Sequence, residues 1–361
     1  MSPLTLSLVL ASQSIPFYIG TYTSPNGSQG IYEARLNLRT GAISKPVLAI
    51  RTENPSYLAV HPNGRYLYSV DESDHGSANA FLIGSGHRLK LIDSQKVRGQ
   101  APTYVSVDPR GKFVLTASYI GGVLSCLPIG RHGALLPVSS EIVNAGSGPN
   151  KERQEGSHMH FALTDSRSRY AYSCDLGTDK VQRYRLRRVH LSRVGRFDAM
   201  ALPGSGPRHG AFGRRGRFLY VCNEMGCTVC TFSVNRHNGA LRRLQTLSTL
   251  TANHPLPGAT TAEIALHPTG RTLYVSNRGD DSVAVFRVRH NGLLKRIQVK
   301  KLPVQTPRGF GIDPTGRWLI ACGQSDDRLV AVQIGRRTGR LGHVGPTIGA
   351  PTPVCIAWPR R

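Results

Sequence analysis

Acidic residues are scarce in this chain, and no block of consecutive basic residues compensates for them. Asp and Glu number 21 against 46 Lys and Arg, so the formal net charge is +25. A positive charge of this size attracts phosphates, carboxylates and other anions. Because no run of five or six basic residues occurs, we expect the charge to be spread evenly over the surface, with no specific nucleic-acid partner.

Long apolar runs are also missing. The run Leu4 to Ala11 is too short to cross a bilayer, and no basic segment precedes it as in a signal peptide. We therefore expect a cytoplasmic protein with no membrane partner, an exported form being the alternative. Residues 1–15 are assigned to a leader or disordered segment.

Metal-binding patterns are absent as well. The seven cysteines are an odd number, and most lie in strand-like runs, which predicts buried free thiols. Cys227 and Cys230 have the spacing of a zinc-ligand pair, but no second pair or nearby histidine motif completes four ligands. We expect no metal site and no organic cofactor.

What the sequence does contain is a repeated strand–turn–strand unit. Six copies share a residue that marks the turn: Gly64, Gly111, Ser168, Gly216, Gly270 and Gly316. Successive marks are 47, 57, 48, 54 and 46 residues apart, a period of about one four-stranded propeller blade. Most copies place a proline two residues before the glycine. Proline fixes φ and glycine supplies a positive φ, so the pair suits a tight turn between strands.

The two ends of the chain complete each other. Phe17 to Leu36 predicts a hairpin that lacks an inner partner, and Pro351 to Trp358 supplies one further strand after the last full copy. Six full blades and one assembled from both ends make seven, which leaves no open sheet edge. The sequence therefore predicts an all-β fold: a seven-bladed β-propeller of four-stranded antiparallel blades, closed by the N- and C-terminal strands. A single domain would cover residues 16–361. The alternative, a β-solenoid, would need a shorter repeat and caps.

Ionisable residues gather where the strands of these repeats begin and end. They are His158, His160, Arg208, Glu224, Arg278 and Arg308. Because neighbouring strands are antiparallel, the start of one and the end of the next lie at the same rim. The two histidines are two residues apart and would face the same way on a strand. One His, one Glu and three Arg are expected to converge on the mouth of the central channel.

Six short motifs carry a resemblance to a known family. They are Gly20-Thr-Tyr-Thr23, Gln154-Glu-Gly-Ser-His-Met-His160, Gly206-Pro-Arg-His209, Asn223-Glu224, Ser276-Asn-Arg278 and Pro307-Arg-Gly-Phe310. Together, over Phe17 to Trp358, they resemble the seven-bladed propeller lactonase family, which includes propeller-type 6-phosphogluconolactonases and fungal carboxymuconate cyclases. The resemblance implies a site at the centre of one face, formed by a histidine with Arg208, Glu224 and Arg278. His158 fits the phosphogluconolactonase-like pattern and His160 the cyclase-like one. Arg308 and Gln324 resemble the phosphogluconolactonase branch.

Such a set of side chains suits the hydrolysis of an anionic lactone. The attacking water needs a general base, for which His or Glu can serve. The oxyanion and a phosphate on the substrate need charge-assisted donors, which arginine supplies. We expect Glu224 or His158 to be the base, with His160 open as the other imidazole. Arg208 and Arg278 would hold the anion and the oxyanion, and Arg308 and Gln324 would contact the substrate more weakly.

We therefore predict a monomeric lactonase that hydrolyses a sugar-acid lactone, with 6-phosphogluconolactone of the pentose phosphate pathway as the first candidate. A carboxymuconate-type cyclase or another lactonase is one alternative. A non-catalytic propeller that binds an acidic partner is the other.

Several of these residues also have a purely structural interpretation. Glu224 could simply pair with Arg208 or Arg278, His158 and His160 could be loop histidines bonded to the backbone, and His209 is expected to be structural. Asp175, Asp179, Asp280 and Asp281 are expected to cap turns. Tyr68, Tyr172, Tyr220 and Tyr274 are expected to pack within strands.

Overall fold

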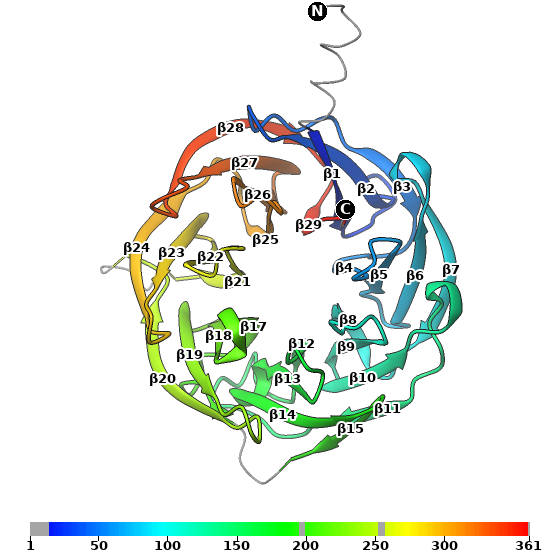
Figure 1. Ribbon diagram of the computed structural model, residues 1–361, viewed down its shortest axis with the longest axis vertical. Coiled ribbons are helices and arrows are strands. Elements are labelled where there is room, and N and C mark those ends of the chain that lie inside the picture. The colour runs from blue at the N-terminus through cyan, green and yellow to red at the C-terminus, as the bar shows by residue number, and fades with distance from the viewer. Residues whose placement is uncertain (1–13, 195–198, 252–256, 360–361) are drawn as a thin grey trace, which may run out of the picture.

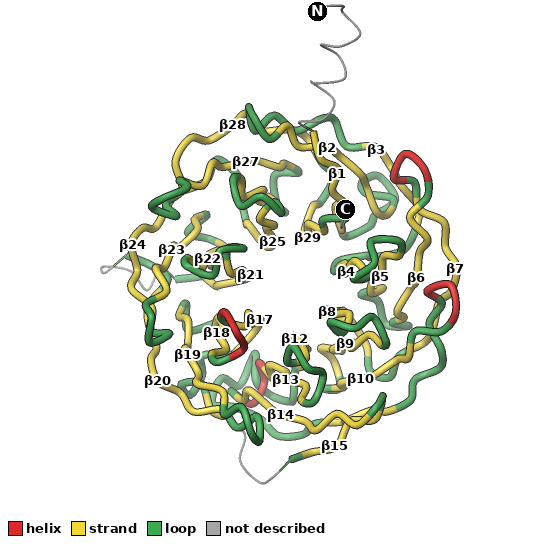
Figure 2. Tube along the Cα trace, viewed as in Figure 1, coloured by secondary structure: helices red, strands yellow, loops and turns green. Residues whose placement is uncertain are grey.

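The computed structural model describes residues 14–194, 199–251 and 257–359, and these form a closed ring of seven β-sheets around a central axis (Figure 1). All neighbouring strands within a sheet pair antiparallel. The described helices are four single 3-10 turns (Figure 2), none of which has the length or apolarity to cross a membrane. The predicted all-β, seven-bladed propeller is confirmed.

Six blades follow one another along the chain, each from its inner to its outer strand, and the remaining blade takes its inner strand from the C-terminal end. The first blade consists of β29 (Pro353–Ala357), β1 (Ser14–Thr21), β2 (Gly30–Asn37) and β3 (Val47–Arg51). The second consists of β4 (Leu58–Val60), β5 (Tyr66–Asp71), β6 (Ser77–Ile83) and β7 (Leu89–Lys96). The third consists of β8 (Gln100–Val107), β9 (Phe113–Ile120), β10 (Val123–Pro128) and β11 (Ser140–Val143).

The fourth blade has a fifth, short strand. It consists of β12 (Met159–Thr164), β13 (Tyr170–Asp175), β14 (Lys180–Arg187) and β15 (His190–Arg193), with β16 (Ala199–Met200) pairing to β14. The fifth blade consists of β17 (Pro207–Phe212), β18 (Phe218–Asn223), β19 (Thr228–Val234) and β20 (Leu241–Ser248).

The sixth blade consists of β21 (Thr260–Leu266), β22 (Thr272–Arg278), β23 (Ser282–Val288) and β24 (Leu294–Lys301), and the seventh of β25 (Pro307–Ile312), β26 (Trp318–Gly323), β27 (Arg328–Ile334) and β28 (Leu341–Gly349). The 3-10 turns are η1 (Ser85–His87), η2 (Arg131–Gly133), η3 (Leu176–Thr178) and η4 (Arg214–Gly216).

The turn residues behave as the repeat predicts. Gly64 has a φ of 70°, and Ser168, the one mark that is not glycine, adopts the same left-handed region with a φ of 50°. The Ser168 hydroxyl donates a hydrogen bond of 2.9 Å to Asp108 of the preceding blade, which helps to hold this conformation. The left-handed turn position that the repeat predicts is therefore confirmed even in the one copy that has serine in place of glycine.

The ring closes as predicted, with β29 pairing antiparallel to β1 through Ile19 and Ile356. The first strand begins at Ser14, two residues before the expected start of the domain, while residues 1–13 of the expected leader lie outside the described residues. All seven cysteines are free and buried, as predicted.

Candidate functional site

A cavity of about 410 Å³ opens at the rim where inner strands begin and second strands end. Six of the seven blades contribute to its lining, which consists of Glu72, Ala101, Thr103, Tyr119, Arg153, His160, Glu224, Thr260, Arg278 and Arg308. A larger hollow of about 830 Å³ lies at the outer strands β20 and β24, but its described lining contains no carboxylate and no histidine. The smaller cavity is therefore the candidate site.

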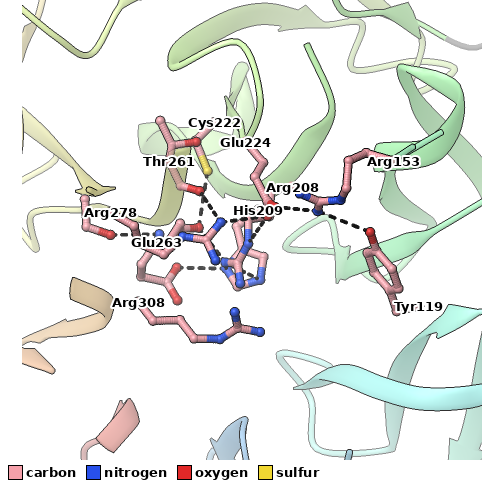
Figure 3. A network of polar contacts seen from close by, with 12 residues as sticks. Tyr119, Arg153, Arg208, His209, Cys222, Glu224, Thr261, Glu263, Arg278 and Arg308 are labelled. Carbon is pink, nitrogen blue, oxygen red and sulfur yellow. Dashed lines mark hydrogen bonds and ion pairs between the residues drawn. The ribbon is translucent and has the colours of Figure 1, made fainter. Parts of the chain in front are cut away.

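Glu224 lies at the centre of an ion-pair network (Figure 3). It follows β18, and its side chain is only 5% exposed. Its Oε2 accepts from Arg208 Nε at 2.8 Å and lies 3.1 Å from Arg278 Nη2, and its Oε1 accepts from Arg153 Nη2 at 2.8 Å. Both carboxylate oxygens are thus held by guanidinium groups from three separate chain segments.

These contacts set the charge of the network. Burial by itself would raise the pKa of the Glu224 carboxyl, but Arg278, Arg208 and Arg153 outweigh it and lower the pKa to about 2. Burial lowers the pKa of Arg278 to about 10, even though Glu224 opposes that shift. At neutral pH the Glu224 carboxylate and the Arg278 guanidinium are therefore both charged.

His160 is the histidine that lines the cavity. It lies at a bulge in β12, where pairing with β13 shifts register between Met159 and Phe161. Its Nδ1 is buried without a hydrogen-bond partner among the described residues. Burial lowers the pKa of its imidazole well below the usual range, and Arg208 adds to this effect. The ring is consequently neutral at physiological pH.

His158 is occupied elsewhere. Its ring stacks on Tyr119 with centroids 4.3 Å apart, its Nε2 lies 2.9 Å from Glu155 Oε1, and its Nδ1 lies 3.1 Å from the carbonyl oxygen of Tyr119. With both ring nitrogens engaged and no place in the cavity lining, His158 is placed to hold the loop before β12.

A second buried pair lies below the cavity. His209 Nδ1 is 3.2 Å from Glu263 Oε1, and the His209 ring packs against His160 and Tyr104 with centroids 5.0 Å away in each case. Burial lowers the pKa of His209 to about 4, although Glu263 opposes this shift. The pair is enclosed by aromatic rings, which agrees with the expected structural role of His209.

Arg308 occupies the other side of the cavity. Its Nη2 donates to the Tyr22 hydroxyl at 2.7 Å, its guanidinium lies over the Tyr22 ring at 5.3 Å, and Glu72 Oε1 is 3.9 Å away. The side chain is 19% exposed. A guanidinium held this firmly, yet still facing the cavity, is suited to bind an anion.

The structure thus brings together most of the residues that the sequence singled out. His160, Glu224, Arg278 and Arg308 line the cavity. Arg208 lies just below it, 2% exposed, and also donates from Nη1 to the Ala262 carbonyl at 2.6 Å.

Two candidates lie apart from the cavity lining. The predicted pairing of His158 and His160 on one face does not occur, because the strand begins only at Met159 and bulges at once. Gln324 follows β26 and does not line the cavity, and its backbone N–H donates to the Thr306 carbonyl at 3.2 Å.

Sequence reasoning missed several members of the site. Arg153 lies in the charged insert, Tyr22 in the Gly-Thr-Tyr-Thr motif, and Glu72 directly after a second strand. Tyr22 and Glu72 obey the rule used for the others, namely an ionisable or hydroxyl side chain directly after a strand end on this rim, whereas Arg153 lies within the insert, away from any strand end. Applying that rule to every blade would have found Tyr22 and Glu72, but not Arg153.

Chemically, the cavity combines a neutral imidazole with several positive charges. A neutral imidazole can accept a proton from water, and guanidinium groups can stabilise an anionic substrate and an oxyanion. The arrangement fits water attack on a carbonyl within an anionic molecule of sugar size.

Comparisons with known proteins also indicate a lactonase. A family model described as a lactonase with a seven-bladed β-propeller matches residues 16–358. Over 344 residues the chain is 36% identical to the 6-phosphogluconolactonase of Bacillus subtilis (strain 168), which covers 94% of this chain and 97% of that protein. Over 334 residues it is 30% identical to a 6-phosphogluconolactonase of Formosa agariphila, covering 90% of this chain and 94% of that one.

A solved structure matches nearly the whole ring. The periplasmic gluconolactonase of Pseudomonas aeruginosa superposes with a TM-score of 0.89 at 28% identity, covering 96% of this chain and 99% of that one.

Proposed function

The chain belongs to the seven-bladed β-propeller lactonases and is a lactone-hydrolysing enzyme, and from this premise we propose that its substrate is 6-phosphogluconolactone. The observation that carries the proposal is the cavity of about 410 Å³, in which His160 lies among Arg153, Arg278 and Arg308. Pockets for small ligands have volumes of roughly 300–1,000 Å³. A phosphorylated sugar lactone is anionic and of this size, and relatives at 36% and 30% identity carry the name of that activity.

His160 is the general base in this proposal. It takes a proton from water as the water oxygen bonds to the lactone carbonyl carbon. The ring C–O bond then breaks, and His160 returns its proton to the leaving ring oxygen, which becomes a hydroxyl group and gives the open-chain acid. Glu224 is a poorer base because three guanidinium groups hold its carboxylate and its pKa is about 2. Its role is to position Arg208, Arg278 and Arg153.

Different arginines bind the two negatively charged groups, the oxyanion and the phosphate. Arg278 stabilises the oxyanion, and Arg308, steadied by Tyr22, holds the phosphate. Arg153 lies in the insert, and its side chain is 42% exposed. It can donate a second hydrogen bond to the substrate phosphate. Hydrolysis transfers no electrons, so the proposal includes no cofactor. We propose a monomeric, cytoplasmic enzyme.

The test is a comparison of freshly generated 6-phosphogluconolactone with unphosphorylated gluconolactone. The wild-type enzyme should prefer the phosphorylated lactone in kcat/KM, and Arg308→Leu should reduce that preference by roughly 10- to 100-fold, because a charge-assisted hydrogen bond contributes about 1.5–3 kcal/mol. Equal rates on both lactones in the wild-type enzyme would contradict the proposed substrate.

The base is tested by a matched pair of variants. His160→Gln should lower kcat on the preferred lactone by roughly 100- to 10,000-fold, whereas His158→Gln should leave kcat nearly unchanged. Because burial lowers the pKa of His160, the acid limb of the wild-type kcat/KM profile should lie below about pH 6.5, the usual histidine value. The reverse order of the two variants, or an acid limb above that pH, would remove His160 from the role.

A further inference from the structure

The face of the ring opposite the cavity carries an excess of positive charge. Thirteen turns lie on this face, which we call the turn face: six join the first and second strands of a blade, and seven join the third and fourth. In sequence these turns are 61–65, 108–112, 165–169, 213–217, 267–271 and 313–317, and 38–46, 84–88, 129–139, 188–189, 235–240, 289–293 and 335–340. They contain 20 of the 46 Lys and Arg residues and only 3 of the 21 acidic residues.

The positive side chains of the turn face point into solvent. Nineteen of the twenty have side chains that the structure describes, and all nineteen are exposed. The three acidic residues serve the turns themselves. Asp108, Asp165 and Asp313 each accept hydrogen bonds from backbone N–H groups of their own turn, and the first two also face the side chains of Arg110 and Arg169 at 3.7 and 3.6 Å. The expectation of evenly spread charge is therefore wrong.

The turn face also has a local concentration of guanidinium groups. A groove of about 560 Å³ lies between the turns of the first and seventh blades and is lined by Arg39, Arg317 and Arg336 beside the Trp318 ring. No carboxylate lies in its described lining. Eighteen of the twenty basic residues of the turn face are arginines, whose planar forks match phosphate oxygens.

We infer that the turn face binds the surface of an anionic phospholipid bilayer. Charge that serves only solubility is usually mixed in sign, as it is over the rest of this chain, where 26 basic residues accompany 18 acidic ones. Here one sign dominates the turns on one face of the ring, and the ring is seen face-on when viewed down the shortest axis of the molecule (Figure 1). A flat anionic surface can meet basic turns around the whole ring at once.

Nucleic acid fits this face less well. Single-stranded bases stack on exposed aromatic rings. An aromatic residue directly follows five of the turns, but all of these except Phe218 are buried: Tyr66, Phe113, Tyr170, Phe218 and Trp318. A duplex is a rod and would contact only a band of turns, leaving most of the ring unused. Lipid headgroups attract each basic residue near the surface independently. The phosphate-rich bilayer therefore accounts for more of the observed charge.

Such binding would leave the enzyme active. The cavity opens on the opposite rim, at the starts of inner strands and the ends of second strands, so it would face away from the lipid. The inference does not depend on which lactone is hydrolysed, and it replaces the expectation of no membrane partner.

The experiment is sedimentation of the full chain with vesicles of phosphatidylcholine alone and of phosphatidylcholine with phosphatidylglycerol. The chain should bind the anionic vesicles at least tenfold more tightly, and high salt should release it because charge–charge attraction at a surface is screened. A variant with Arg39, Arg317, Arg336 and Arg337 changed to Gln should bind the anionic vesicles at least tenfold more weakly, with lactonase activity unchanged.

A matched control removes the same charge elsewhere. Arg51, Lys96, Arg98 and Arg328 are exposed and lie at strand ends on the cavity side of the ring, and changing these four to Gln should weaken binding much less. The inference is overturned if the anionic vesicles do not bind at low salt, if both variants weaken binding equally, or if duplex DNA at equal phosphate concentration binds more tightly than the vesicles.

Discussion

At the scale of single residues, the site depends on one carboxylate that neutralises several cations. Glu224 is buried, and its two oxygens contact Arg153, Arg208 and Arg278. Removing one partner from such a network leaves the other charges buried and unpaired, which destabilises more strongly than the pair itself stabilises. Glu224 therefore matters to folding as well as to the cavity.

We predict that Glu224→Gln lowers the free energy of unfolding by on the order of 3 kcal/mol at pH 7. The pKa of Glu224 is lowered from 4.5 to about 2 on folding. The ionised carboxylate thus stabilises the fold above pH 4.5, and this contribution declines as the pH falls toward 2. Urea unfolding of both proteins at several pH values measures the difference.

The control for this prediction is Glu141→Gln, a carboxylate on the outer strand β11 for which the described residues show no ion pair. Its unfolding free energy should change by less than about 0.5 kcal/mol. A Glu224→Gln deficit that stays constant from pH 7 to pH 3 would show that the lost stability does not come from ionisation.

At the scale of strands and turns, neighbouring blades are joined by a repeated tyrosine contact. Four buried tyrosines on second strands donate to a glycine carbonyl in an outer turn of the next blade: Tyr68 to Gly133 at 3.0 Å, Tyr172 to Gly239 at 2.9 Å, Tyr220 to Gly292 at 2.9 Å and Tyr274 to Gly339 at 2.7 Å. The sequence predicts that these tyrosines pack within strands, and all four are fully buried. Their hydroxyl groups additionally set the spacing between blades.

We predict that Tyr220→Phe destabilises the protein by about 1–3 kcal/mol, because the buried Gly292 carbonyl loses its donor while the ring stays in place. Tyr32→Phe is the control, since among the described residues its hydroxyl contacts only the exposed Gln29 N–H, from which it accepts. Thermal or urea unfolding compares the two. Equal stability of both variants would contradict a joining role for the hydroxyl.

Aspartates at the blade ends also form hydrogen bonds between their side chains and the backbone. Asp179 accepts from the N–H groups of Gly204 and Gly206, and Asp281 accepts from the N–H of Thr306. Asp175 accepts from the N–H of His158, so the predicted bonds from side chain to backbone are confirmed for these three. Asp280 differs, because its carboxylate binds the Ser282 hydroxyl and the Lys301 ammonium.

At the scale of the whole molecule, stability depends on the strand that closes the ring. β29 pairs with β1 and also packs against β25 of the seventh blade, and Val354 and Cys355 are buried. Without β29 the first blade would have three strands and an open edge facing the channel.

We predict that truncation after Gly349 abolishes cooperative thermal unfolding and causes aggregation, as followed by circular dichroism and light scattering. Truncation after Trp358 removes only residues 359–361 and should unfold like the full chain. If the shorter chain unfolded cooperatively at the full-length temperature, ring closure would not be needed for the fold.

The sequence by itself determined the architecture. A turn that needs proline and a positive φ recurs at blade spacing, and the two ends each lack the strand that the other supplies. These are local requirements of the backbone, so they can be read along the chain. The same reasoning found His160, Glu224, Arg278 and Arg308, because antiparallel pairing fixes which strand ends share a rim.

Only the tertiary structure decided what each side chain does. Because of the bulge at the start of β12, His160 lines the cavity, while His158 contacts Glu155 instead. Arginines from three separate chain segments contact Glu224. The ring also gathers scattered basic turns onto one face. Bulges, pKa values and the sidedness of charge depend on contacts between residues that are distant in the chain, and these exist only once the ring has closed.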